Sequence, residues 1–208
     1  MREKIAKILT LLFQPIFVPL YGFILLWNSS YFYPYSIFIK VMVLGLSFLF
    51  MVILPAIFYA ILYKRGKITT PQASNSKERI PVYMFTMCSY SMLIYLLLYI
   101  GVVYYFTYIA IGAFLSLLII FIVNFYWKIS AHTTGMGGLL GAVMYINWVQ
   151  YENLLWLYVA IIICGALVSS ARLQLKAHTS MQLLAGYSVG FACVGILPWC
   201  VTMFFNVL

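Results

Sequence analysis

The chain contains only two histidines, His132 and His178, and each lies close in sequence to a cation. Two imidazoles that titrate near neutral pH can supply one nucleophile and one proton donor. Arg79, Arg172 and Lys77 could hold phosphoryl oxygens, and an arginine can bind two oxygens at once. Phosphoryl transfer needs an in-line nucleophile, charge stabilisation and a protonated leaving group. These residue types therefore predict phosphoryl chemistry.

Other roles for these residues have to be weighed. A single histidine near a helix end usually caps carbonyls or lies at the membrane interface, and basic loops often only set topology. Two histidines on one face favour a function, because ionisable groups facing a bundle interior are usually functional. A metal site is not favoured, because the chain has no aspartate and Glu78 with two histidines is a poor ligand set. A serine hydrolase triad lacks its acid, although Ser130 lies near His132.

The composition indicates the setting in which these residues work. The 208 residues are 66% hydrophobic and only 7% charged, and the mean hydropathy is +1.07. Soluble domains are about a quarter charged, so a water-soluble globule is excluded. The net charge is +9, but the cations occupy short loops, which favours an anionic substrate or the surface of the lipid bilayer over nucleic acid. We expect residues 1–208 to form one integral membrane domain.

The spacing of the charges predicts the helices. Four charged islands, at 1–7, 64–79, Lys128 and 172–176, separate apolar stretches at 8–63, 80–127, 129–171 and 177–208. At about 20 residues per crossing, the first three stretches hold two helices each and the last holds one. The first crossing would run from Ile8 to Trp27, and uncharged turns are expected at 28–34, near Gly101 and at 150–153. The prediction is an all-α, polytopic helical bundle with six or seven transmembrane helices, seven by this count.

The two ends of this bundle should differ in chemistry. Every cation except Lys40 falls on the end that also carries both histidines. The uncharged turns are rich in tyrosine and tryptophan, which prefer the headgroup layer. The positive-inside rule then places the histidine end in the cytoplasm, and we expect a protein of the bacterial inner (cytoplasmic) membrane. A cluster of glycines after His132 favours close helix packing over phosphate binding; these are Gly135, Gly137, Gly138 and Gly141.

Three short motifs resemble those of the type 2 phosphatidic acid phosphatases, the lipid phosphate phosphatase and haloperoxidase superfamily. The family's third motif, Ser-Arg-x5-His-x3-Asp, matches in spacing at Arg172, His178 and Gln182. The second, Pro-Ser-Gly-His, corresponds to residues 129–132 and keeps the serine and the histidine. The first, Lys-x6-Arg-Pro, corresponds to Arg79-Ile80-Pro81, with Lys77 as a substitute for the family's lysine. The resemblance covers roughly residues 64–185.

The resemblance implies roles for these residues. His178 would attack phosphorus to form a phosphohistidine, and His132 would protonate the leaving alcohol and later activate water. Arg172 and Arg79 would hold the phosphoryl oxygens. Ser130 and the amide of Ala131 would donate hydrogen bonds to the same group. Enzymes of this family need no metal or other cofactor and often act on membrane lipid phosphates, either monoesters or diphosphates.

The sequence departs from the family pattern at Gln182, which stands where the family has an aspartate. A glutamine carbonyl can accept the His178 Nδ1 proton, but it supplies no negative charge. Three hypotheses therefore stay open: a lipid phosphate phosphatase, a weak or inactive member of the same fold that binds or moves an anionic lipid, and a small transporter whose basic loops only set topology. The particular lipid and the oligomeric state stay open as well.

Overall fold

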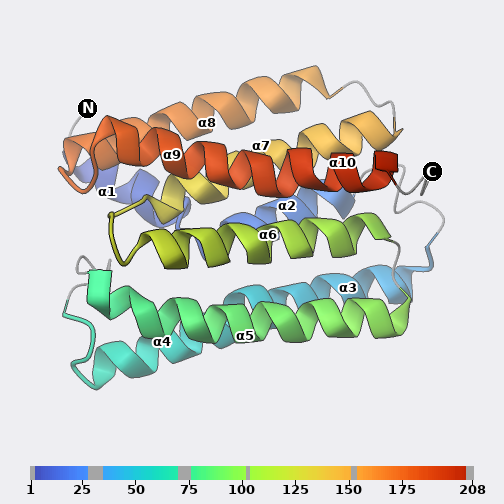
Figure 1. Ribbon diagram of the computed structural model, residues 1–208, viewed down its shortest axis with the longest axis horizontal. Coiled ribbons are helices and arrows are strands. Elements are labelled where there is room, and N and C mark those ends of the chain that lie inside the picture. Colours follow the sequence, from blue (N-terminus) through green and yellow to red (C-terminus); the bar gives the residue numbers. More distant parts are fainter. Residues whose placement is uncertain (1–2, 28–34, 70–75, 102–103, 151–153, 205–208) are drawn as a thin grey trace.

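A computed structural model describes residues 3–27, 35–69, 76–101, 104–150 and 154–204. All regular secondary structure in these ranges is helical, as the composition predicts (Figure 1). The helices are α1 (Glu3–Leu12), α2 (Val18–Trp27), α3 (Ile37–Phe48), α4 (Leu54–Lys64), α5 (Ser76–Ile100), α6 (Tyr104–Val123), α7 (Ala131–Gln150), α8 (Leu155–Gln174), α9 (Ser180–Phe191) and α10 (Leu197–Phe204), with π-helical segments η2 (Leu49–Ile53) and η3 (Ala192–Ile196).

Two pairs of helices are joined through π-helical turns. Segment η2 links α3 to α4 immediately before Pro55, and η3 links α9 to α10 immediately before Pro198. A proline ring clashes with the carbonyl four residues earlier and offers no amide proton. The wider π turn takes up this mismatch without ending the helix. Each pair therefore makes one continuous rod, over Ile37–Lys64 and Ser180–Phe204.

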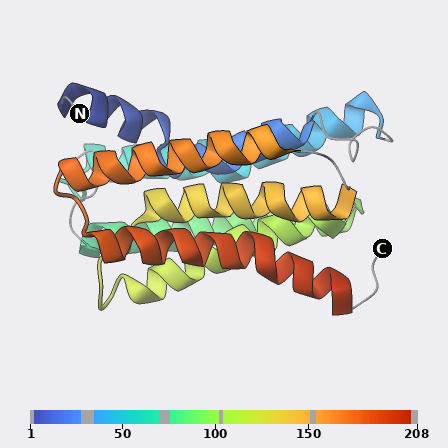
Figure 2. The same cartoon turned by 90° about the horizontal axis from the view of Figure 1, so that it is seen from above.

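Five helices of the described chain are long and apolar enough to cross a membrane: Ile37–Lys64, Lys77–Ile100, Tyr105–Val123, Leu155–Gln174 and Ser180–Phe204. The expected membrane bundle is thus supported, whereas the count of six or seven crossings stays a prediction. Helix α7 is also 20 residues long, but it lies between α8 and α9 in the interior of the bundle (Figure 2).

The first apolar stretch differs from the prediction. A single helix was expected over Ile8–Trp27, but the structure has two ten-residue helices, α1 and α2, separated at residues 13–17. Pro15 explains the break, because a proline disfavours helical geometry at the residue before it and removes a backbone donor. Helix α1 packs against α8, and α2 packs against α7.

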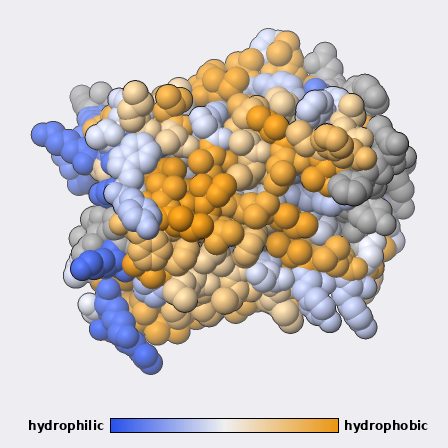
Figure 3. Space-filling model, viewed as in Figure 1, coloured by the Kyte–Doolittle hydropathy of each residue, from blue (hydrophilic) through white to orange (hydrophobic). Residues whose placement is uncertain are grey.

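The charged loops gather at one end of the bundle, as the sequence predicts. The connections α4–α5, α6–α7 and α8–α9 all lie at the left end in Figure 1, together with α1. The side chains of this end are hydrophilic, while the sides of the bundle are largely apolar (Figure 3). We call it the charged end. Gly101 ends α5 with a φ of +71° at the opposite end, where a turn was expected. The other two uncharged turns, at 28–34 and 151–153, lie outside the described residues.

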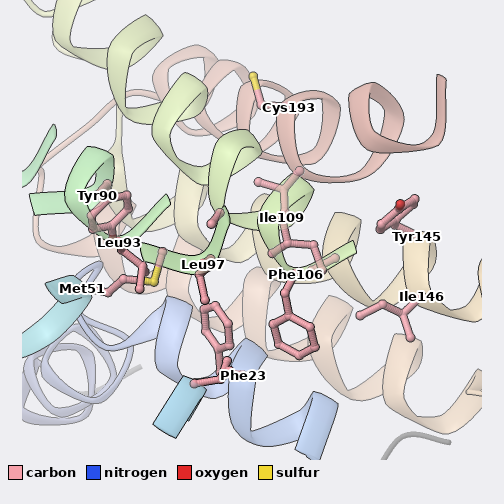
Figure 4. Packing of buried hydrophobic residues seen from close by; sticks show 14 of the residues in the cluster. Phe23, Met51, Tyr90, Leu93, Leu97, Phe106, Ile109, Tyr145, Ile146 and Cys193 are labelled. Carbon is pink, nitrogen blue, oxygen red and sulfur yellow. The ribbon is translucent and has the colours of Figure 1, made fainter. Parts of the chain in front are cut away.

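The main core joins α2, η2, α5, α6, α7 and η3 through large buried side chains (Figure 4). Phe23 stacks on Phe106 with ring centroids 5.3 Å apart. The Tyr145 hydroxyl hydrogen-bonds to Thr202 Oγ1 at 2.8 Å, which satisfies both buried groups. This core stabilises the middle of the bundle.

Candidate functional site

A cavity of about 410 Å³ opens among the helices at the charged end. His132, His178, Arg79 and Arg172 line its polar part. The lining continues along α7 as far as Ala142, ten residues and about 15 Å beyond His132. Apolar side chains from α2, α5, α6 and α7 form this deeper part. One cavity therefore combines a cationic mouth with an apolar interior.

A short connection between α8 and α9 brings the side chains of Arg172 and His178 to the same site. Helix α8 ends in a Schellman motif: the Ala177 amide donates to the Arg172 carbonyl at 3.1 Å and the Lys176 amide to the Leu173 carbonyl at 2.9 Å. Lys176 takes the left-handed position with a φ of +49°, which glycine usually occupies. The chain therefore reverses within a few residues and delivers His178 beside the end of its own helix.

Helix α9 begins directly after His178 with a capping box. The Thr179 hydroxyl accepts from the Gln182 amide at 3.4 Å, and Gln182 Oε1 accepts from the Thr179 amide at 3.1 Å. The same Gln182 oxygen lies 3.3 Å from His178 Nδ1. Gln182 therefore fixes both the start of α9 and the imidazole.

His178 has a second fixed partner. Its Nδ1 lies 3.1 Å from the backbone carbonyl oxygen of Lys128, in the α6–α7 loop. Both neighbours of Nδ1 are acceptors, so the proton of the neutral ring belongs on Nδ1. Nε2 then carries the lone pair. This is the tautomer that a nucleophilic histidine needs.

The electrostatic surroundings keep this ring uncharged. Burial, followed by the nearby Arg172 and Arg79, lowers the pKa of His178 to about 4. The pKa of Lys128 is lowered by burial and by the same two arginines. The cations of two helices and one loop thus lie close to His178, and its ring is an unprotonated base at neutral pH.

His132 lies in the first turn of α7 and is only 9% exposed. Its Nε2 has no hydrogen-bond partner among the described residues. Arg172 is 4% exposed, and its Nε also has no partner in the described part of the chain. Buried polar atoms are rarely left unsatisfied. Their shared position at the cavity indicates a polar ligand.

Close contact between α7 and α9 sets the relation of the two histidines. A Cβ atom on Gly137 would collide with the Tyr187 carbonyl oxygen, and one on Gly190 with the Thr134 carbonyl oxygen. Gly141 likewise faces Gly195 backbone to backbone. The glycines after His132 thus serve helix packing, as predicted. Without side chains in between, the two backbones approach closely enough to align the start of α7 with the start of α9.

Ser130 joins these two helix starts. Its amide donates to the Gln182 carbonyl at 3.4 Å, and its hydroxyl accepts from the Thr133 amide at 3.5 Å. The side chain therefore caps α7 and is fully buried. Ala131, next in the chain, lines the cavity. Of the two expected phosphate donors, Ala131 thus lines the cavity, whereas Ser130 is not part of the lining and its hydroxyl caps α7.

Two residues of the α5 start lie elsewhere. Lys77 is exposed and does not line the cavity, unlike Arg79 two residues later. Glu78 accepts from the Thr69 hydroxyl at 2.7 Å and from the Thr69 amide at 3.3 Å. This carboxylate therefore anchors the loop after α4. The charge missing at Gln182 is not replaced by Glu78.

The motif analysis missed three site residues. Lys128 supplies the carbonyl for His178, Tyr83 lies within hydrogen-bonding reach of Arg79, and Thr10 lines the cavity from α1. Helical spacing could have suggested Tyr83, four residues after Arg79. A backbone carbonyl leaves no trace in residue type, so no sequence signal marks the role of Lys128.

No group of three or more histidine, cysteine, aspartate or glutamate side chains that could hold a metal ion occurs among the described residues. No family model, curated protein or solved structure matches this chain.

Proposed function

We propose that this protein is a membrane-embedded phosphatase that hydrolyses a phosphomonoester or diphosphate of a membrane lipid through a phosphohistidine. One observation carries the proposal: two buried arginines and two histidines line one cavity at the charged end, and the described lining of that cavity contains no carboxylate. The Nε of Arg172 has no partner in the described part of the chain, and a buried guanidinium without a counter-charge is costly. An incoming phosphate would supply that charge, and the apolar interior suits a lipid chain.

The proposed first step uses the His178 tautomer. Nε2 attacks phosphorus with its lone pair while the bond from phosphorus to the ester oxygen breaks. His132, protonated in the complex with the phosphate dianion, gives its proton to the leaving alcohol. Arg79 and Arg172 hold the non-bridging oxygens as charge shifts among them. The product is a phosphohistidine. Its positively charged ring donates hydrogen bonds from Nδ1 to Gln182 Oε1 and to the Lys128 carbonyl oxygen.

The second step returns the enzyme to its starting state. His132, now neutral, takes a proton from a water molecule as its oxygen attacks phosphorus. The bond from phosphorus to Nε2 breaks, and the electron pair returns to His178. Inorganic phosphate leaves with the added oxygen. The two proposed steps require no oxidant, reductant or metal.

The decisive experiment is phosphate release by detergent-purified protein. Phosphatidic acid, phosphatidylglycerol phosphate, undecaprenyl diphosphate and lipid A are each tested beside His178→Ala. Release that disappears in His178→Ala supports the proposal and identifies the substrate class. Absence of release on every lipid, from folded protein that binds them, would favour the alternative function of anionic-lipid binding, which the neutral Gln182 at the nucleophile supports.

The orientation is part of the proposal. Lys64, Arg65 and Lys67 lie at the charged end but outside the cavity lining, so they count toward topology independently of catalysis. On the basis of the positive-inside rule, we propose that this end faces the cytoplasm and that the membrane is a bacterial inner membrane. In a cysteine-free background, Lys67→Cys should react with an impermeant thiol reagent only after the cells are opened. Labelling of intact cells would place the site outside.

A further inference from the structure

Helix α1 brings a hydroxyl group to the cavity that belongs to none of the three motifs. Thr10 is 4% exposed and lines the cavity with His132 and Arg172. The Thr10 backbone also lies next to the His132 imidazole. Its Oγ1 has no hydrogen-bond partner among the described residues. A buried hydroxyl without a partner is unfavourable, so its position requires an explanation.

Several other helical hydroxyls of this chain are satisfied locally. They donate to a carbonyl three or four residues earlier on the same helix, as is common for serine and threonine. The residues that do so are Ser47, Thr86, Ser91, Ser116, Thr134, Ser169 and Thr202. Thr10 does not, although Ala6 provides the equivalent carbonyl one turn earlier. Its hydroxyl is therefore left for a ligand.

The packing of α1 determines where the Thr10 side chain lies. Ala6 and Thr10, one turn apart, form the buried face of α1, which packs against α8. Ile8 and Leu11 lie on the exposed side. Helix α8 carries Arg172 in its last turn. The packing of α1 on α8 thus accompanies the presence of Thr10 and Arg172 in the lining of the same cavity.

Three unsatisfied buried atoms meet at this cavity from three helices: Thr10 Oγ1 of α1, His132 Nε2 of α7 and Arg172 Nε of α8. A tetrahedral oxyanion offers acceptor oxygens to the Thr10 hydroxyl and the Arg172 guanidinium, and to His132 in its protonated form. We propose that Thr10 donates a hydrogen bond to a phosphoryl oxygen bound by Arg172, so that α1 completes the phosphate site. The identity of the anion as a phosphoryl group rests on the proposed function.

The test compares three variants of the full chain. Thr10→Val removes the hydroxyl at nearly constant shape, and Thr10→Ser retains it. The matched control is Thr107→Val, because Thr107 is 1% exposed, lies outside the cavity lining, and has an Oγ1 that likewise has no partner in the described part of the chain. Orthovanadate, a phosphate analogue, is titrated calorimetrically into each detergent-purified protein after gel filtration and circular dichroism establish folding.

We expect Thr10→Val to weaken vanadate binding about tenfold, the usual effect of losing a hydrogen bond to a charged group. Thr10→Ser and Thr107→Val should bind within about twofold of the unchanged protein. On a lipid that the protein hydrolyses, Thr10→Val should raise KM or lower kcat/KM by the same factor. Unchanged vanadate affinity in Thr10→Val, or an equal loss in Thr107→Val, would overturn the assignment.

The two proposals fail in different ways. If no lipid is hydrolysed but vanadate binding depends on Thr10, the phosphatase proposal fails and the assignment of Thr10 to an oxyanion site holds. If lipids are hydrolysed through His178 with equal kcat/KM in Thr10→Val, only the role of Thr10 is refuted. If the unchanged protein does not bind vanadate and releases no phosphate, both proposals are wrong.

Discussion

Replacement of Gln182 by glutamate tests the central contact of the site. It converts the neutral acceptor 3.3 Å from His178 Nδ1 into a carboxylate of nearly the same shape. Glutamate also suits the third position of α9, because it completes a capping box with Thr179 as well as glutamine does. A negative charge is moreover favoured in the first turn of a helix. The fold should therefore tolerate the change.

The expected gain follows from the strength of hydrogen bonds. A neutral bond contributes about 0.5–1.5 kcal/mol and one to a charged group about 1.5–3 kcal/mol. The 3.3 Å separation is slightly longer than the usual range, so we take the lower end of both ranges and expect a gain of about 1 kcal/mol. This corresponds to a roughly fivefold faster formation of phosphohistidine. The same energy raises the pKa of His178 by about 0.7.

The assay follows the phosphoryl-enzyme by rapid mixing with a radiolabelled lipid phosphate and an alkaline quench. Gln174→Glu is the control, because Gln174 is exposed in the last turn of α8 and the change adds the same charge to the same end of the bundle. We expect Gln182→Glu to be faster and Gln174→Glu to be unchanged. Equal acceleration of both, or a rate at or below that of the unchanged protein in folded Gln182→Glu, would refute the role assigned to Gln182.

Three further predictions address protonation, packing and metal dependence. Because the pKa of His178 is lowered to about 4, its ring is neutral above that pH, and in His132→Ala its modification by diethylpyrocarbonate should stay fast down to about pH 5; a midpoint near 6.5 would contradict the lowered pKa. Gly137→Ala should destabilise the protein by about 1–3 kcal/mol, measured as a fall in Tm in detergent, because its Cβ would meet the Tyr187 carbonyl. Gly45→Ala, with nothing within 4 Å, should not lower Tm, and equal losses would contradict the packing argument. EDTA should leave phosphate release intact, and strong inhibition that added metal reverses would count against the histidine mechanism.

Some of the site follows from local sequence. The spacing of Arg172 and His178 is contained in one helix end, one left-handed residue and one capping box, all within a short segment. Interactions between residues this close along the chain depend little on the rest of the fold. The contact between Gln182 and His178 belongs to the same class, since the two residues are four apart. For this reason the sequence could predict the contact between the Gln182 side chain and His178 Nδ1.

The first motif shows where local sequence is insufficient. Lys77 and Glu78 directly precede Arg79, yet of these three residues only Arg79 lines the cavity. Successive residues on a helix point about 100° apart, so the direction of each depends on how α5 is rotated against its neighbours. Helix α5 does not separate its polar and apolar residues into two faces, so it gives no periodic signal for that rotation. Sequence alone could not tell which of the three residues faces inward.

The sequence by itself determined the helical class, the membrane setting, the charged end and the segment that carries Arg172 and His178, because composition and short-range hydrogen bonding decide these features. Only the tertiary structure decided that the Lys128 carbonyl holds His178, that Glu78 anchors a loop, and that Thr10 reaches the cavity. In a lipid bilayer, apolar surface is nearly as favourable against lipid as against another helix. Hydrophobic pattern therefore leaves the buried face of each helix open, and close packing at glycines such as Gly137 and Gly190 selects it.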